Sequence, residues 1–232
     1  MKKVKFFDCT LADLPLDMQE IYTLMGYGSH IPDDNVMQII HETLHELNER
    51  ITPHYGYVLV TGETIGLEQL HLENIQFNPG RIITHAMKGA ECYAIFTVTI
   101  GKEFDLYCKQ LKEKDDMLRV FITDAIGSVL AEAAVSKLMK QIEQKASEQD
   151  LHISNNYSPG YCDWVLSEQK LLFQLFPKDT TGIQLTESCL MLPVKSVSGI
   201  VAIGKNIKKR PYGCDICKMS SCIKNKKKHQ SN

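Results

Sequence analysis

Long apolar runs are missing from this sequence of 232 residues. No stretch approaches the roughly 18 consecutive apolar residues of a membrane span, and the lysine-bearing N-terminus lacks the apolar centre of a secretion signal. A cytoplasmic protein is therefore expected, and its eight cysteines are not expected to form a disulfide framework. Hydrophobic residues make up 44% and charged residues 23% of the chain, as in ordinary globular proteins with a sizeable core.

A glycine-rich phosphate loop after the first predicted strand is also missing, and predicted helices and strands do not alternate regularly. This pattern argues against a doubly wound nucleotide-binding fold. It predicts an α+β fold, with a mostly antiparallel, twisted sheet and flanking helices. Strands are expected, from β-branched and aromatic content, within residues 55–60, 89–101, 188–193 and 196–204.

Apolar residues recur at helical spacing in three segments. Residues 32–50 predict an amphipathic helix that Asp33 or Asp34 can cap. Residues 114–149 predict one or two long helices with a broad apolar face, and residues 165–176 predict a shorter helix.

The sequence NNYSPGYCDW follows the long predicted helix. Pro159 presets φ and Gly160 permits a positive φ, so the pair predicts a turn that directs the next residue outward. Such a turn exposes main-chain groups, and the rings of Tyr157 and Tyr161 can enclose a flat or cationic ligand. Trp164, the only tryptophan, supports the interpretation that the turn faces something. The alternative is a rigid corner whose tyrosines pack on the core.

Further motifs accompany this turn along the chain. They read LMGYGSHIPDDNV, KGAECYAIFTVTIGKEFD, TDAIGSVLAEA, SPGYCDW and GIQLTESCLMLPVKSVSG. Together they resemble the activation domain of cobalamin-dependent methionine synthase, where an Arg-x-x-Pro-Gly-Tyr turn precedes a Leu-Thr-Glu-Ser … Pro … Ser-Val-Ser-Gly segment. The resemblance covers roughly Leu24 to Gly204. It predicts a domain over residues 1–204 and a basic, cysteine-rich tail over residues 205–232.

The resemblance implies a function in reactivation. Domains of this family bind S-adenosylmethionine (SAM) beside cobalamin that a neighbouring domain or protein carries. A flavodoxin-type donor reduces the inactive cob(II)alamin, and methyl transfer from SAM to cob(I)alamin pulls that unfavourable reduction forward. The domain mainly positions the methyl group, so no catalytic side chain is expected. The sequence is thus expected to be a stand-alone module acting in trans on methionine synthase or another corrinoid protein.

The resemblance also implies which residues bind SAM. Main-chain groups around Tyr157, Ser158 and Gly160 would hold the adenine or methionine part, with Tyr161 beside them. Glu132 stands where the family places a carboxylate for the ligand's amino group, which suits the positive charge of SAM. The alternative for Glu132 is a glutamate on the surface of a helix.

Two segments leave further alternatives open. Glu187 and Ser188, in the LTES motif, either belong to the site or satisfy main-chain groups at a strand edge. The KSVSG motif is read equally well as a close-packed strand entry, in which Gly199 allows the approach of another backbone.

The sequence departs from the family at Asn156, which replaces the arginine of the motif. Asparagine offers neither the charge nor the forked pair of hydrogen bonds with which arginine grips a carboxylate. The family's tyrosine pair after the Ser-Val-Ser-Gly strand is also missing. A second hypothesis is therefore a non-catalytic partner of a corrinoid protein, with a degenerate SAM pocket.

The tail contains Cys214, Cys217 and Cys222 in a C-x₂-C-x₄-C pattern. Three such thiolates can chelate zinc or hold an iron–sulfur cluster, which would make the protein a redox adaptor. Reduced thiols in a mobile tail are the alternative. The tail holds nine of the 26 basic residues and one of the 28 acidic residues, which suits an acidic partner or simply solubility. No nucleic-acid or membrane partner is expected. The candidates for a fourth metal ligand are His229, Cys162 and Cys189.

Overall fold

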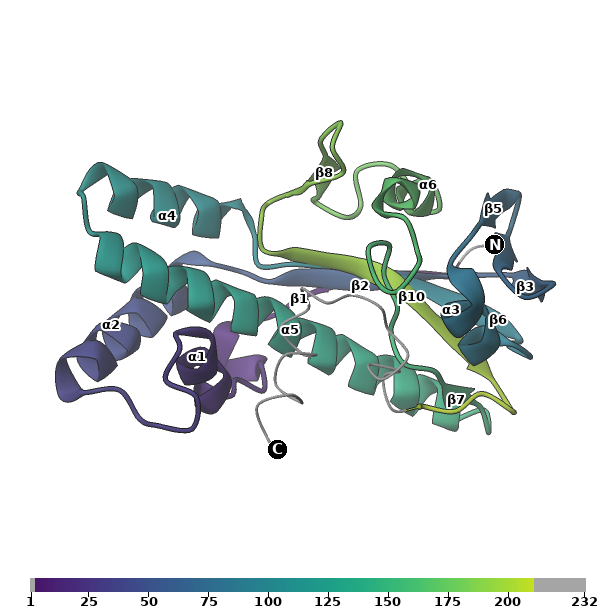
Figure 1. Ribbon diagram of the computed structural model, residues 1–232, viewed down its shortest axis with the longest axis horizontal. Helices are drawn as coiled ribbons and strands as arrows, with labels where there is room; N and C mark the ends of the chain where they lie inside the picture. The colour runs from purple at the N-terminus through teal and green to yellow at the C-terminus, as the bar shows by residue number, and fades with distance from the viewer. Residues whose placement is uncertain (1–2, 211–232) are drawn as a thin grey trace.

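A five-stranded antiparallel sheet forms the centre of the molecule (Figure 1). The structure is a computed structural model and describes residues 3–210. The strands lie in the order β1-β2-β6-β10-β7. Their bounds are Lys3–Asp8 for β1, His54–Val60 for β2, Cys92–Thr99 for β6, Ser196–Gly204 for β10 and His152–Ile153 for β7. The predicted α+β fold is confirmed, with β6 in the middle of the sheet.

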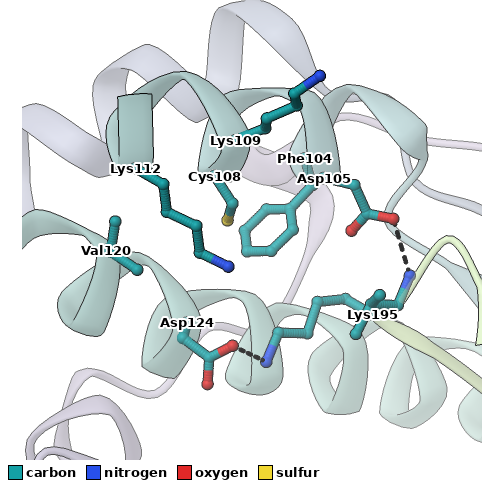
Figure 2. A pocket seen from close by; sticks show the side chains of 9 residues that line it. Phe104, Asp105, Cys108, Lys109, Lys112, Val120, Asp124 and Lys195 are labelled. Carbon is teal, nitrogen blue, oxygen red and sulfur yellow. Dashed lines mark hydrogen bonds and ion pairs between the residues drawn. The ribbon is translucent and has the colours of Figure 1, made fainter. Parts of the chain in front are cut away.

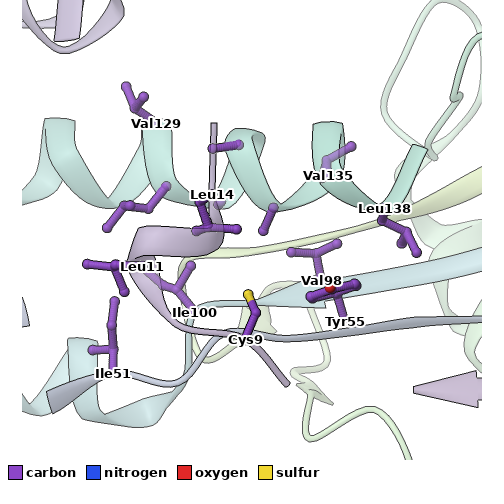
Figure 3. Close-up of a cluster of buried hydrophobic side chains, with 14 of the residues drawn as sticks. Cys9, Leu11, Leu14, Ile51, Tyr55, Val98, Ile100, Val129, Val135 and Leu138 are labelled. Atoms are coloured by element: carbon purple, nitrogen blue, oxygen red, sulfur yellow. The ribbon is translucent and has the colours of Figure 1, made fainter. Parts of the chain in front are cut away.

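Four helices cover one face of this sheet and enclose the larger core. They are α1 (Met18–Leu24), α2 (Asp34–Arg50), α4 (Lys102–Glu113) and α5 (Met117–Ser147). Figure 3 shows part of this core, to which Leu138 of α5, Leu11 of the N-terminal segment and Val98 of β6 contribute side chains. The long predicted helix is thus a single one, and the Asp33 side chain caps α2 as expected. Among the described residues, none of the helices combines the length and apolar character needed to cross a bilayer.

The opposite face of the sheet carries a second core built from shorter elements. These are a three-stranded meander of β3 (Gly62–Ile65), β4 (Gln69–Leu72) and β5 (Ile75–Phe77), then α3 (Gly80–Met87) and α6 (Gln169–Phe173). A 3₁₀ turn over Leu166–Glu168 leads into α6, so the helix predicted in residues 165–176 is confirmed but short. The meander, β1, α1, α3 and α4 were not predicted.

Trp164 belongs to this second core. Its side chain is only 2% exposed and meets the Phe77 ring edge-on, with ring centroids 6.1 Å apart. The interpretation that Trp164 marks a turn facing a ligand is therefore wrong for this residue, because its ring is needed to fill the interior. An aromatic ring beside a turn buries a large area in either setting, so sequence alone does not separate the two.

A buried carboxylate anchors Trp164 to the meander. Glu168 Oε2 accepts hydrogen bonds from Trp164 Nε1 at 2.7 Å and from the Asn78 main-chain N–H at 2.9 Å. Its other oxygen, Oε1, accepts from Asn78 Nδ2 at 3.0 Å. These three bonds compensate the burial of the carboxylate and fix the chain that leaves the Pro159-Gly160 turn.

Replacing Glu168 with leucine should destabilise the protein by about 3 kcal/mol, because the buried Trp164 Nε1–H and two N–H groups of Asn78 lose their acceptor. Glu168→Gln is the matched control, since its amide oxygen can still accept the two bonds now made to Oε2. Urea unfolding followed by the fluorescence of the single tryptophan measures both losses. Equal midpoints for wild type and Glu168→Leu would contradict this role.

Candidate functional site

The candidate site lies along the outer edge of β10. One edge of this strand pairs with β6 from Ser196 to Ile203. On the other edge β7 pairs only with Ile203 and Gly204, and Tyr157 bridges to Ile200. Within residues 3–210, no strand pairs with residues 196–199 on this outer edge. The beginning of β10 is therefore not covered by a neighbouring strand on this edge.

The predicted turn stands beside this open edge. The Tyr161 N–H donates to Ser158 O at 3.0 Å, and Gly160 has a φ of 97°, as a turn with glycine at its third position requires. Tyr161 is directed outward as predicted, and its side chain is 49% exposed. The Gly160 N–H donates to Trp164 O at 2.8 Å, which closes the corner.

The turn is attached to β10 by close main-chain contact. Ser158 Oγ donates to Ser198 O at 2.6 Å, and Tyr157 and Ile200 exchange two main-chain hydrogen bonds. A Cβ atom on Gly199 would lie 2.5 Å from Tyr157 O and 2.8 Å from Ser158 Oγ. The prediction that Gly199 permits a backbone approach is therefore confirmed.

A cleft of about 570 Å³ opens between the turn, β10 and α5. Ser158, Pro159 and Tyr161 of the turn line one side, and Glu132 reaches the cleft from α5. The remaining lining comes from the start of α6, from the segment before β10 and from β10 itself. These residues are Leu166, Gln169, Ser188, Cys189, Leu190, Met191, Val194, Ser196, Val197 and Ser198.

A small hairpin forms the wall opposite the turn. Its strands β8 (Gln184–Leu185) and β9 (Met191–Leu192) are joined by a tight loop in which the Thr186 N–H donates to Leu190 O at 2.9 Å. The strand predicted in residues 188–193 is thus shortened to two residues by this loop. Gln169 Nε2 donates to Cys189 O at 3.4 Å and ties the hairpin to α6.

The structure brings some of the predicted site residues together. Glu132, Ser158 and Tyr161 line the same cleft although 29 positions separate the first from the last along the chain. Glu187 is exposed on the hairpin loop and lies outside the lining, whereas its neighbour Ser188 belongs to it. Their roles in binding stay predictions.

Other groups of the predicted site residues form hydrogen bonds within the fold. Tyr157 is buried, and its main-chain N–H and C=O bond to Ile200. Burial also raises the pKa of the Tyr157 phenol, which keeps it neutral. The N–H of Gly160 is used within the turn, and Asn156 is half-buried just before it. The turn therefore presents Ser158, Pro159 and Tyr161 to the cleft.

The cleft combines a carboxylate with a largely apolar wall. Leu166, Leu190, Met191, Val194 and Val197 supply apolar surface. Glu132 is an exposed side chain of α5 and is the one acidic residue in this lining, so it gives the cleft a negative charge. Sequence reasoning missed Gln169 and these apolar residues, because only the path of the hairpin brings them to the site.

No group of three or more His, Cys, Asp or Glu side chains suited to a metal ion occurs within residues 3–210. Cys162 and Cys189, two of the candidate fourth ligands, form no disulfide within the described residues. The predicted ligands Cys214, Cys217 and Cys222, together with His229, lie outside the described residues.

Comparison with known proteins agrees with the observed fold. Residues 81–214, more than half of the chain, match the family described as vitamin B12 dependent methionine synthase, activation domain. The chain belongs to this family. Its fold is similar to that of the MetH reactivation domain in a crystal structure with AdoHcy bound, with a TM-score of 0.71 and 16% sequence identity. That match covers 90% of this chain and 80% of the other.

Gly199→Ala should destabilise the protein by about 1–3 kcal/mol, because the new methyl group overlaps the main chain of Tyr157 and forces the turn away from β10. Gly199→Val adds more volume at the same point and should cost more. Chemical denaturation of the three proteins measures this series. An unchanged midpoint for the alanine variant would contradict the close contact.

Proposed function

We propose that the protein binds S-adenosylmethionine in the cleft and supports the reductive methylation of a corrinoid held by another domain or protein. The observation that carries this proposal is the meeting of Glu132, Ser158 and Tyr161 in one cleft of a methionine synthase activation domain. AdoHcy, the ligand of the structurally similar MetH domain, is SAM without its transferable methyl group. When bound, SAM supplies the methyl group and the corrinoid accepts it.

The residues of the cleft suit the different parts of SAM. The Glu132 carboxylate can accept charge-assisted hydrogen bonds from the ammonium group of the ligand. The exposed ring of Tyr161 can lie against the flat adenine or the positively charged sulfonium group. Ser158 and Tyr161 are held in place by the turn, so little conformational entropy is lost when a ligand binds.

Strand β10 adds main-chain groups along the floor of the cleft. Residues two apart in a strand direct their N–H and C=O groups to the same edge. Ser198 therefore faces the outer edge with Ile200, whose groups bond to Tyr157 there. The Ser198 carbonyl accepts from Ser158 Oγ, and its N–H is directed toward the cleft, where it can donate to a carboxylate or an adenine nitrogen.

An apolar rim around the cleft suits the docking of the corrinoid-bearing protein. Six exposed apolar side chains line the cleft or adjoin a lining residue in the sequence, and each is between 41% and 54% exposed. They are Tyr161, Val165, Leu166, Leu190, Leu192 and Val194. Exposed apolar surface typically marks an interaction site where it is extensive. We propose that cobalamin-dependent methionine synthase or another corrinoid protein docks here, in the cytoplasm, with a flavodoxin-type protein as electron donor and the module acting in trans.

A second function is favoured by one observation, the replacement of the motif arginine by Asn156. In this reading the domain docks on a corrinoid protein without binding SAM, and the tail cysteines carry zinc, an iron–sulfur cluster or a redox signal. The two functions differ in one measurable property, the affinity of the cleft for SAM.

Isothermal titration should show SAM and AdoHcy binding with dissociation constants below about 1 mM. Glu132→Gln should weaken SAM binding about tenfold, because loss of a charged hydrogen bond costs about 1.5 kcal/mol. Glu187→Gln is the matched control, since Glu187 is an exposed acid near the cleft but outside its lining. Wild-type protein that binds neither ligand would contradict the first function and leave the second.

Asn156→Arg should tighten SAM binding about tenfold, because arginine restores a charged, forked donor for the ligand's carboxylate. Asn156→Lys is the control for charge alone and should gain less, since lysine lacks the planar fork. The same titration measures both variants. A loss of affinity in the arginine variant would show that the carboxylate lies elsewhere.

A further inference from the structure

The wall of the cleft formed by Val194 separates two cavities. Val194 lines the 570 Å³ cleft and also a second cavity of about 290 Å³ between α4 and α5 (Figure 2). Close-packed atoms normally hold a segment in a protein interior. The wall at residues 194–195 has a cavity behind it instead, so packing alone does not fix its position.

Polar contacts from two helices hold this wall in place. Lys195 Nζ lies 2.7 Å from Asp124 Oδ1 and donates to Ser128 Oγ at 2.8 Å, both on α5. The Val194 N–H donates to Asp105 Oδ2 on α4 at 3.0 Å. Figure 2 shows Asp105 and Asp124 on opposite sides of the cavity, each bonded to the wall. We refer to these contacts of Asp105, Asp124 and Ser128 with residues 194–195 as the clasp.

The clasp fixes the wall relative to the residue that would bind the ligand's ammonium group. Asp124, Ser128 and Glu132 recur every four residues on α5, so they follow one another on the same face of the helix. Lys195 binds the first two, and Glu132 enters the cleft one turn further along. The distance across the cleft between Glu132 and the wall therefore depends on Lys195.

The electrostatics of the second cavity favour this arrangement. The Lys195 side chain is 13% exposed and that of Asp124 is 69% exposed, so water partly screens their ion pair, and the hydrogen bond to Ser128 Oγ adds to the hold on the Lys195 ammonium. Lys109 and Lys112 of α4 line the same cavity and repel the Lys195 ammonium, whereas Asp105 of α4 carries the opposite charge, and its Oδ2 accepts from the Val194 N–H. Burial raises the pKa of the Cys108 thiol to about 11, so this side chain stays neutral and offers no counter-charge.

We propose that Lys195, through the clasp, is a positioning residue that sets the width of the cleft for its ligand. The inference rests on the proposed function, because it concerns the same cleft. Lys195 acts through Asp124 and Ser128, to which its ammonium group bonds. Lys195 lines the second cavity, on the side of the wall that faces away from the ligand.

A double-mutant cycle with AdoHcy as the probe tests this coupling. Lys195→Met and Asp124→Asn should each weaken AdoHcy binding about tenfold. The double variant should bind AdoHcy as tightly as the single variant with the lower affinity, because both substitutions break the same contact. Lys195→Arg should recover most of the affinity. Lys209→Met is the control, since it breaks another 2.7 Å ion pair to α5, with Glu143, and should stay within twofold of wild type.

Hydrogen exchange of the ligand-free protein supplies a second readout. Two amides report on the wall: the Val194 N–H bonds to Asp105, and the Ile100 N–H bonds to Lys195 O. Both should exchange about tenfold faster in Lys195→Met than in wild type, while the urea midpoint stays unchanged. Faster exchange with unchanged affinity, or additive losses in the cycle, would overturn the proposal. Wild-type protein that fails to bind AdoHcy would instead contradict the proposed function. Unchanged exchange of the two amides in Lys195→Met would refute the role of the clasp, whether or not AdoHcy binds.

Discussion

The turn at Ser158–Tyr161 can touch strand β10 only because residue 199 has no side chain. The two hydrogen bonds between Tyr157 and Ile200, and the bond from Ser158 Oγ to Ser198 O, need this approach. They place the exposed Tyr161 over the outer edge of the strand, while Trp164 and Glu168 hold the far side of the turn in the second core. The cleft thus opens beside a part of the sheet edge that no strand covers within residues 3–210.

The same edge explains why the cleft takes its walls from both faces of the sheet. Helix α5 lies in the larger core and brings Glu132, whereas α6 belongs to the smaller core and brings Gln169. The hairpin of β8 and β9 closes the space between them. Gln169 bonds to Cys189 of the hairpin loop, and Asp105 and Asp124 hold residues 194–195, which follow the hairpin. The shape of the cleft depends on contacts outside it, because its walls belong to separate elements.

Local patterns in the sequence predicted the elements that carry the site. The β-branched run of β10, the apolar periodicity of α5 and the Pro159-Gly160 turn each have a signature within a few residues. The burial of Trp164 and the internal use of the Tyr157 and Gly160 N–H groups have none, because they depend on tertiary neighbours. For the same reason the meander and the apolar wall at Leu190 and Val194 were not predicted, since short strands and loops show little periodicity.

A crystal structure of the protein with AdoHcy is the most direct measurement of the central claim. The account predicts the ligand between Tyr161 and the wall at Val194, with its ammonium group at hydrogen-bonding distance from the Glu132 carboxylate. An empty cleft at saturating AdoHcy, or a ligand bound elsewhere on the molecule, would contradict it.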